Sequence, residues 1–321
     1  MLEAALRLPL SVLSFVLGTL VGSFLNVVIA RLPRGESIVH PRSHCPKCGD
    51  MIPAWLNVPI LSWLVLRGRC RACKCPISVR YPMVELLTGV LFWACFTRFG
   101  LTWGLLAGFI FAGSMVAITF IDIDTFEIAD EISLPGIVIG ILLRPVAFAA
   151  PWWSGLAGAV LGASFLLLVR IVWSTYMALR IRLAKGQPQE VLEELESKRE
   201  GMGLGDVKLI AMIGAFLGPP SLIPVVLVAS VVGTVIGGAL LLHQALRPPP
   251  PPTAEELAAI EAEREARKKL ALARGEEPDD WEPASTAVPF GPFLAIGALT
   301  WMLVGPALER WFFQALGLVP P

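Results

Sequence analysis

Long apolar segments alternate with polar, charged stretches along the whole chain. A helix that crosses the hydrocarbon core of a membrane needs about 20 mostly apolar residues, and by that criterion the sequence predicts about eight membrane-spanning helices. They lie near residues 9–30, 83–98, 102–121, 132–149, 153–178, 205–217, 221–243 and 288–317. The sixth segment is short, which indicates a half-span or a tilted helix.

The first apolar segment, residues 1–30, has the hydropathy of a signal peptide but not its other features. Its positive charges, Arg31 and Arg34, follow the apolar run rather than precede it. No small-residue cleavage site closes the run. We therefore predict a retained first transmembrane helix whose N-terminus lies outside the cytoplasm.

Polar regions between the apolar segments define the predicted domains. Residues 31–82 form a cysteine-bearing domain after the first helix, and residues 83–243 form a transmembrane core. Within that core, residues 179–204 are a charged loop. Residues 244–287 are a proline-rich and charged insertion, and residues 288–321 carry the last transmembrane helix.

The insertion opens with five prolines, residues 248–252, which favour extended polyproline geometry. Thr253 and Glu256 then have the spacing of a helix-capping box. The stretch that follows, up to Arg274, is rich in Ala, Glu, Lys and Arg. It predicts a helix exposed to solvent.

The distribution of basic residues predicts the orientation in the membrane. The three polar regions hold 20 of the 26 Lys and Arg residues, whereas the short connections on the other side carry few, such as Arg98 and Arg144. Loops rich in Lys and Arg stay in the cytoplasm. An even number of spans then places both termini outside, so helix count and charge agree.

Composition supports the same class. Hydrophobic residues make up 55% of the 321 residues and charged ones 16%, with a mean hydropathy of +0.69. Soluble domains are nearer a quarter charged. The formal net charge is zero, so nothing points to nucleic acid as a partner. We predict an all-α polytopic membrane protein with a small cytoplasmic loop domain.

Two carboxylates occupy matching positions in this topology. Asp122 ends the third predicted helix, and Asp206 opens the sixth, so both lie at the cytoplasmic edge of the membrane. Ionisable groups at the edge of apolar helices are costly and tend to mark function. One carboxylate of a pair can act as general base on a water while the other protonates the carbonyl. Such a pair with a water is sufficient for peptide hydrolysis, so Asp122 and Asp206 are candidates for a catalytic pair; the alternative is that they are solvated at the membrane surface.

Other polar residues near this pair have simpler interpretations. Asp124 and Asp130 are expected to be solvated loop residues. Gly203 and Gly205, just before Asp206, allow close approach of a substrate strand or a positive φ. A helix N-terminus makes Asp206 a candidate for the ionised partner, but base and acid stay unassigned. The three histidines lie in or beside loops and form no convincing triad.

Two pairs of cysteines predict a metal site in residues 31–82. Cys45 and Cys48 form one C-x-x-C pair, and Cys70 and Cys73 form a second after a gap of 21 residues. Four thiolates on tight turns suit tetrahedral zinc, and such a closed site is structural. Cytoplasmic thiols stay reduced, which disfavours disulfides.

Alternatives to these four ligands stay open. Cys75 could replace Cys73 as a ligand, and His44 precedes Cys45. Cys95 lies in an apolar segment and is expected to be core. The apolar stretch 54–66 between the pairs is too short to span a membrane. It either lies on the membrane surface, where it could present a substrate, or forms the core of the small domain.

Several motifs resemble the bacterial type IV prepilin peptidase and N-methyltransferase family. Gly203-Leu204-Gly205-Asp206 resembles its GxGD motif, and Phe120-Ile121-Asp122-Ile123-Asp124, with Asp130, resembles its first aspartate motif. Further similar segments are Val21-Gly22-Ser23-Phe24-Leu25-Asn26-Val27-Val28, Arg31-Leu32-Pro33, Arg80-Tyr81-Pro82 with Glu85, and Pro289-Phe290-Gly291-Pro292-Phe293. The resemblance covers nearly the whole chain. It departs at Ala129, where the family has proline, and at the long regions 179–204 and 248–287.

The resemblance implies a GxGD aspartic membrane protease in which Asp122 and Asp206 are catalytic. It implies a bacterial inner membrane protein that cleaves type IV pilins, or pseudopilins of type II secretion, after glycine at the cytoplasmic face. It also implies N-methylation of the new N-terminus from S-adenosylmethionine. Glu85 and the domain 31–82 are the only guesses for that second site.

Three other functions are weighed against this one. A transporter or proton relay also uses paired carboxylates, but nearer the membrane midplane and often with internal repeats. An assembly scaffold would explain the cysteines but leave both aspartate motifs without a purpose. A presenilin-type protease shares the GxGD chemistry but not the cysteine domain.

Overall fold

The computed structural model describes most of the chain, namely residues 2–45, 47–53, 58–184, 203–246 and 288–315, with Ala258, Ala262, Glu265, Lys268, Lys269 and Leu272. Within these residues every regular element is helical, apart from two isolated β-bridges in the cysteine domain, His44–Met51 and Arg69–Pro76. The prediction of an all-α protein is confirmed.

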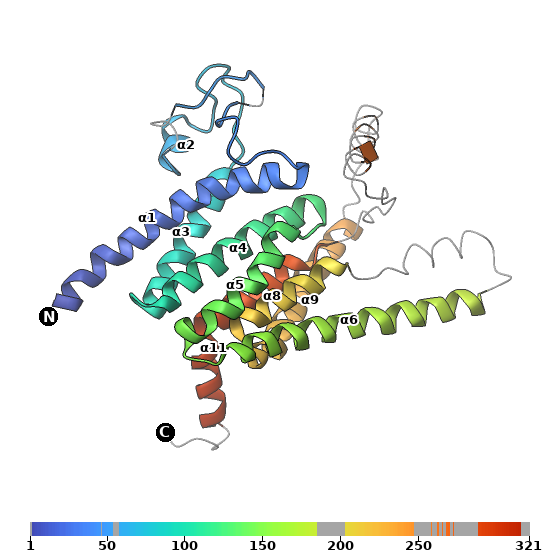
Figure 1. The fold of residues 1–321 in the computed structure, drawn as a ribbon. Coiled ribbons are helices and arrows are strands. Elements are labelled where there is room, and N and C mark those ends of the chain that lie inside the picture. Colours follow the sequence, from blue (N-terminus) through green and yellow to red (C-terminus); the bar gives the residue numbers. More distant parts are fainter. Residues whose placement is uncertain are drawn as a thin grey trace.

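Eight helices, seven of them with at least 19 residues, stand at the eight predicted places in this part of the chain. They are α1 (Leu2–Arg31), α3 (Arg80–Phe99), α4 (Trp103–Thr125), α5 (Asp130–Phe148), α6 (Trp152–Leu183), α8 (Leu204–Leu217), α9 (Leu222–Leu246) and α11 (Gly291–Ala315). Helix α6 differs from its prediction, because it continues to Leu183 into the region expected to be a loop. The bundle and the cysteine domain above it are seen in Figure 1.

Six of these helices are long and apolar enough to cross a membrane. Helix α8 has 14 residues, and the apolar part of α11, Gly291–Gly305, is also below the usual length. The predicted number of about eight spans is therefore supported only approximately. The expectation that the sixth segment is short is confirmed.

Helix α8 lies at the centre of the bundle. Leu209, Ile210, Met212 and Ile213 have no exposed surface, and the Phe216 ring lies 5.0 Å from that of Phe111 on α4. A helix that is apolar all round is buried on every side. Helices α5, α6, α9 and α11 pack around it, so the position of α8 is fixed by its neighbours.

Glycines bring α6 and α8 into backbone contact. A Cβ added at Gly158 would overlap the carbonyl of Gly214, and one added at Gly214 would overlap the carbonyl of Gly158. Gly162, one turn further along α6, faces the carbonyl of Ile210 in the same way. Small residues at such spacing allow membrane helices to approach closely.

Arg144 was predicted to lie in a short outer connection, and the structure corrects this assignment. It lies within α5 with 8% of its surface exposed, and its Nη1 donates to the carbonyl oxygen of Phe216 at 2.7 Å. Its Nε donates to the Ser154 hydroxyl on α6. The last carbonyls of a helix lack partners within it. Arg144 therefore satisfies the end of the short α8 inside the protein, where water is scarce.

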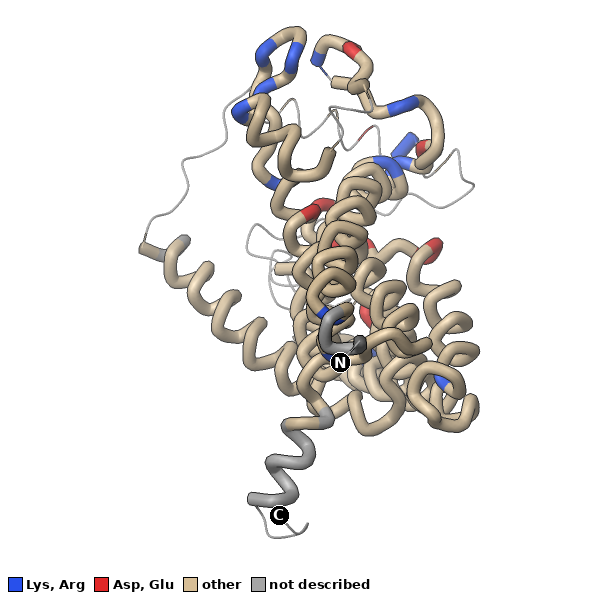
Figure 2. The backbone as a smooth tube through the Cα atoms, turned by 90° about the vertical axis from the view of Figure 1, so that its left-hand side faces the viewer, with Lys and Arg blue, Asp and Glu red and all other residues tan. Residues whose placement is uncertain are grey.

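The structure places the start of α1 and the end of α11 at the end of the bundle away from the cysteine domain (Figure 1). Figure 2 shows many of the Lys and Arg residues gathered at the opposite end, in the cysteine domain. This arrangement agrees with the even number of helices.

The six described residues of the predicted solvated helix are helical and exposed, with Lys269 within 3.8 Å of Glu265. Its predicted cap at Thr253, the proline run and most of region 179–204 lie outside the described residues.

Candidate active site and metal centre

Asp122 is held in the last turn of α4. The helix ends with the amide of Phe126, in a left-handed conformation, donating to the carbonyl of Asp122 at 2.9 Å. The side chain is 5% exposed, and its Oδ2 accepts the backbone amide of Gly291 at 2.9 Å. This amide opens α11 and has no partner within its own helix. Asp122 thus caps a helix that begins 169 residues later in the chain.

Asp206 lies in the first turn of α8, two residues after it begins at Leu204. Gly205 packs against the side chain of Ile128, because a Cβ there would lie 3.0 Å from the Ile128 Cβ. Asp206 is partly buried and close enough to Asp122 for their charges to interact. The structure therefore brings together the two carboxylates that the sequence predicted as a pair.

Asp124 and Asp130 form ion pairs with basic residues on neighbouring helices. Arg80, at the start of α3, donates to Asp124 at 2.6 Å and to the carbonyl of Phe120 at 3.0 Å. Lys208, on α8, lies 2.7 Å from both carboxylate oxygens of Asp130, at the start of α5. Both acids are partly exposed, as expected, but they join neighbouring helices rather than stand alone in solvent. Each pair steadies a helix that carries one of the buried acids.

The arrangement suits hydrolysis by two carboxylates. Since Gly291 occupies Oδ2 of Asp122, the other oxygen is available to hold a proton or to accept one. A water between Asp122 and Asp206 could be deprotonated by one acid while the other protonates a carbonyl. His40, His44 and His243 are exposed and take no part in this cluster.

Ile128 was missed by the sequence analysis. Its side chain lies in the turn between α4 and α5 and contacts Gly205, and its Cδ1 would be 3.5 Å from a Cβ on Gly291. It therefore packs against the starts of both α8 and α11. The Gly291 amide was also missed as a partner of Asp122, although its motif was noted. A lone isoleucine in a turn carries no signal that could have identified it.

We expect Gly291→Ala to reduce activity strongly while the bundle stays folded. The new Cβ would overlap the Asp122 carboxylate, which must then move away from its amide partner. General acid–base groups contribute about 10²–10⁴-fold to rate, so a displaced one should cost at least about tenfold. Initial rates of substrate cleavage check this. The control is Gly237→Ala, on α9, where a Cβ meets nothing within 4 Å. Equal rates for both variants would contradict the role of Gly291.

The four predicted zinc ligands converge in the cysteine domain. The sulfur atoms of Cys45, Cys48, Cys70 and Cys73 all lie within 4.8 Å of one another. Each pair spans a tight turn, with Gly49 in a left-handed conformation after the first. Four soft donors at this spacing fit a tetrahedral metal ion such as zinc. The described residues therefore include a cluster that can hold a metal.

Protonation of the thiols is uneven around this cluster. Hydrogen bonds from the backbone amides of Cys48 and Lys47 lower the pKa of Cys45 to about 6. Cys45 is then a thiolate at neutral pH, the form that binds metals. Cys75 also lies 3.6 Å from the Cys45 sulfur, but its hydrogen bond with Cys73, together with burial, raises its pKa to about 12. Burial and hydrogen bonds with neighbouring thiols also raise the pKa of Cys48 to about 12, so thiol pKa does not select the ligands. The mutual spacing of the four sulfur atoms, within 4.8 Å, favours Cys73 over Cys75 as the fourth ligand.

Glu85 lies on α3 with 8% of its surface exposed. Its Oε2 accepts the backbone amide of Ile60 at 2.7 Å. Glu85 thus ties the cysteine domain to the helix bundle. Cys95, in the same helix, has no exposed surface, which confirms the expectation that it is core.

A cavity of about 370 Å³ lies between α1 and the first cysteine turn. Arg31, Ser23 and Phe24 of the first helix line one side, and Arg42 and Ile52 line the other. Neither aspartate of the pair lines it. The cavity is therefore separate from the candidate peptidase centre.

Comparison with known proteins connects these features. Residues 16–99 match the family described as Bacterial Peptidase A24 N-terminal domain, and residues 109–238 match the Type IV leader peptidase family. A prepilin leader peptidase/N-methyltransferase of Myxococcus xanthus (strain DK1622) is 38% identical over 94% of this chain and 92% of its own. The protein of the same description from Aeromonas hydrophila is 34% identical over 97% of each chain. No solved structure matches the chain.

Proposed function

Because the chain belongs to the type IV leader peptidase family, we propose that it removes the leader from type IV prepilins or pseudopilins and methylates the new N-terminus. The observation that carries the peptidase part is the placement of Asp122 and Asp206. These two acids come from helices α4 and α8, distant in sequence, and lie close enough for their charges to interact, at the end of the bundle that carries the cysteine domain.

Asp122 and Asp206 are the proposed catalytic residues. In the ionised state, one carboxylate takes a proton from the attacking water, whose oxygen bonds to the carbonyl carbon of the scissile peptide. The other acid, protonated, donates to the carbonyl oxygen. The carbon–nitrogen bond then breaks as the leaving amine takes a proton from the acid that received it, and one hydroxyl of the tetrahedral intermediate returns its proton to the other carboxylate as the new carboxyl group forms. The Gly291 amide keeps Asp122 in place throughout.

The proposal includes a location and a topology. The protein spans the bacterial inner membrane, with the cysteine domain and both aspartates at the cytoplasmic face. The excess of Lys and Arg in residues 31–82 supports this orientation, since nine basic residues stand there against two acidic ones. The division into a first helix 1–30, a zinc domain 31–82, a peptidase core 83–243, an insertion 244–287 and a last helix 288–321 is part of the proposal.

S-adenosylmethionine is the proposed methyl donor. This part rests on the described activity of the relatives. Glu85 stays the prediction for its site, and its carboxylate already accepts the Ile60 amide. No step of methyl transfer is assigned to a residue.

The test of the function is processing of a purified pilin precursor by the purified protein, read as the mass of the product. Leader removal that begins the product after glycine, with one added methyl group when S-adenosylmethionine is present, is the expected result. Cleavage without methylation would confine the protein to the peptidase reaction. Absence of cleavage by a folded protein would favour a transporter or a scaffold.

We propose zinc as the metal at Cys45, Cys48, Cys70 and Cys73, with a structural role because four thiolates close the site. Cys45→Ser is expected to lose the metal, to make the loop between the two cysteine pairs sensitive to protease and to lower activity indirectly. Metal content by mass spectrometry and limited proteolysis check this.

Cys75→Ser is the matched control for that variant, because it removes a neighbouring thiol outside the four-residue cluster. It should keep one zinc per chain. A Cys45→Ser protein with full zinc and an intact loop would refute the site. A loss of zinc in Cys75→Ser would identify Cys75, rather than Cys73, as the fourth ligand.

A further inference from the structure

Helix α2 (Leu61–Val65) in the cysteine domain turns an apolar face outward. Val58, Leu61, Leu64 and Val65 are 43%, 59%, 56% and 75% exposed. The spacing of Leu61, Leu64 and Val65 places these three on one side of α2. Val58 is exposed just before the helix, separated from it by Ile60 with its positive φ. We call these four residues the α2 apolar stripe. In a soluble domain such a stripe would face the core.

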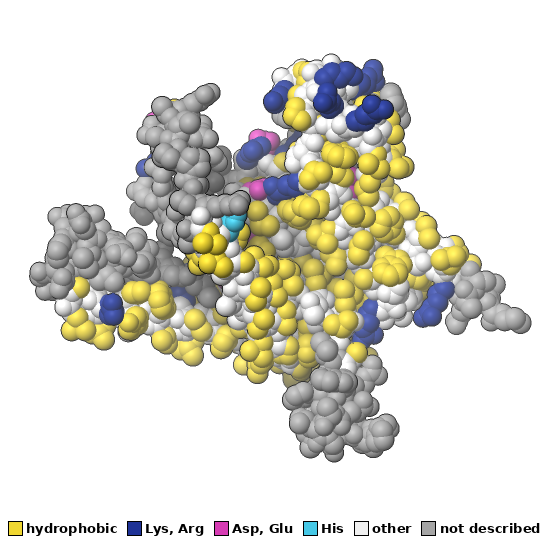
Figure 3. All heavy atoms as spheres, turned by 180° about the vertical axis from the view of Figure 1, so that it is seen from behind, with side chains coloured by type: hydrophobic (Ala, Val, Ile, Leu, Met, Phe, Trp, Pro, Cys, Tyr) yellow, Lys and Arg dark blue, Asp and Glu magenta, His cyan; other side chains and the backbone are white. Residues whose placement is uncertain are grey.

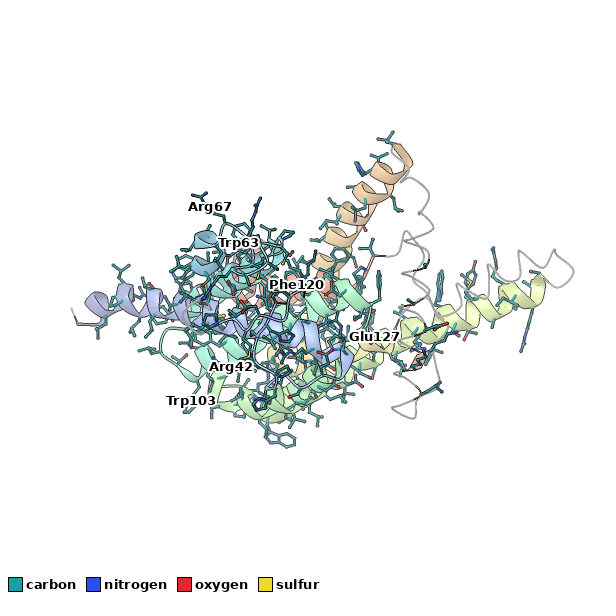
Figure 4. All side chains as sticks on the ribbon, turned by 90° about the horizontal axis from the view of Figure 1, so that it is seen from above. Arg42, Trp63, Arg67, Trp103, Phe120 and Glu127 are labelled. Atoms are coloured by element: carbon teal, nitrogen blue, oxygen red, sulfur yellow. The ribbon has the colours of Figure 1, made fainter. Side chains whose placement is uncertain are left out.

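The core of the domain takes a different face of α2. The indole of Trp63 donates to the carbonyl of Ile77 at 3.1 Å and packs against Gly68, whose Cβ would lie 2.9 Å from the ring. Figure 4, viewed from above, shows Trp63 further in than Arg67, which lies at the outer edge. Of the two uses suggested by the sequence for stretch 54–66, core packing therefore accounts for Trp63. It does not account for the α2 apolar stripe.

The start of α2 is tied to the first turns of α3. Ile60, just before it, donates its amide to Glu85, which lies five residues inside α3. With its 20 residues α3 is about 30 Å long, which is about the thickness of the hydrocarbon core. Glu85 lies about 7.5 Å along this helix, at 1.5 Å per residue. A segment tied there cannot stand far from the lipid.

The surface around α2 fits a bilayer boundary. On the face in Figure 3, hydrophobic side chains continue from the helix bundle onto the cysteine domain, and Lys and Arg gather at its far end. On α3, Met83 and Leu86 are each 48% exposed, so the bundle presents apolar side chains near the same depth. Arg67 and Arg69, directly after α2, are exposed and match anionic headgroups.

We propose that the α2 apolar stripe inserts into the cytoplasmic headgroup–acyl boundary of the same bilayer that the bundle crosses. The cysteine domain is then held on the membrane at two points, by Glu85 from within the protein and by α2 through lipid. The partner is the lipid surface itself. This inference does not depend on which reaction the aspartates perform.

The experiment uses the full-length protein in lipid nanodiscs with a genetically encoded fluorescent amino acid at position 65, which avoids labelling the cysteines. The quencher is bromine on the lipid acyl chains. The control carries the same probe at position 50, where Asp50 is exposed in the same domain. We expect several-fold stronger quenching at position 65 than at position 50.

A second variant keeps the test decisive. Leu61→Ser with Leu64→Ser removes apolar side chains that are already exposed, so zinc should be retained. Quenching of the probe at position 65 should fall to the level at position 50. Equal quenching at both positions in the parent protein, or quenching unchanged by the double substitution, would overturn the proposal. Protection of position 65 only by a second copy or by added prepilin would overturn it in favour of that partner.

Discussion

Asp122→Asn and Asp206→Asn should each abolish leader removal and leave the protein folded in the membrane. Asparagine keeps the shape of aspartate but can neither accept a proton from water nor donate an acidic one. General acid–base catalysis contributes about 10²–10⁴-fold, and in a two-carboxylate site each acid depends on the other. In the Asp122→Asn variant, the new side-chain oxygen can still accept the Gly291 amide, so the start of α11 should stay in place. Product mass and initial rate with a purified prepilin measure the effect.

Glu127→Gln is the matched control for this experiment. Glu127 is exposed in the turn between α4 and α5, close in sequence to Asp122. Among the described residues, the structure records no contact between the Glu127 side chain and either Asp122 or Asp206. The Glu127→Gln variant should cleave at the parental rate. Full cleavage by either asparagine variant would refute the assignment of the pair. A loss of thermal stability in those variants would attribute the defect to folding.

Gly158→Ala should strongly destabilise the bundle. The new methyl group would meet the carbonyl of Gly214 and the backbone of Gly218, neither of which can rotate away as a side chain can. Overpacking of a tight interior commonly costs about 1–3 kcal/mol, and a clash between backbones should reach the upper end of that range. Since α8 carries Asp206, activity should fall with stability. Melting temperature in detergent and the yield of folded protein measure the change.

Gly237→Ala, on α9, separates this effect from helix propensity. Outside its own helix turn, no atom of the described residues lies within 4 Å of a Cβ at Gly237, so alanine should be neutral or slightly stabilising. If the two alanine variants melt at the same temperature, the close approach of α6 and α8 is not important for stability. A large loss of stability in the Gly158 variant alone would confirm that the close approach of α6 and α8 is important for stability.

The sequence determined the helices because membrane insertion leaves a strong local signal. Each of the eight helices overlaps its predicted segment, since about 20 apolar residues in lipid must satisfy their backbone internally, although α1 begins at Leu2, seven residues earlier than predicted. The short length of α8 could also be predicted from the sequence. The sequence could not predict that α6 continues to Leu183, because a helix that leaves the membrane is no longer marked by hydropathy.

Candidate chemistry was predictable where it depends on residue type and local spacing. The two C-x-x-C pairs bring their thiols to one point because each occupies a tight turn, and the sulfur atoms lie within 4.8 Å. Asp122 and Asp206 were identified because carboxylates at the ends of apolar helices are costly and stand in motifs. The predicted topology alone assigned both to one membrane face.

Only the tertiary structure decided how these groups are held. The Gly291 amide reaches Asp122 across 169 residues, Glu85 accepts the Ile60 amide, and Arg144 closes the end of α8 from within α5. Ile128 touches the starts of two helices at once. Such contacts depend on the packing of distant segments and leave no periodic or compositional trace. The sequence by itself therefore determined the helices and predicted their orientation and the candidate catalytic residues, whereas packing decided which backbone groups and glycines hold those residues in place.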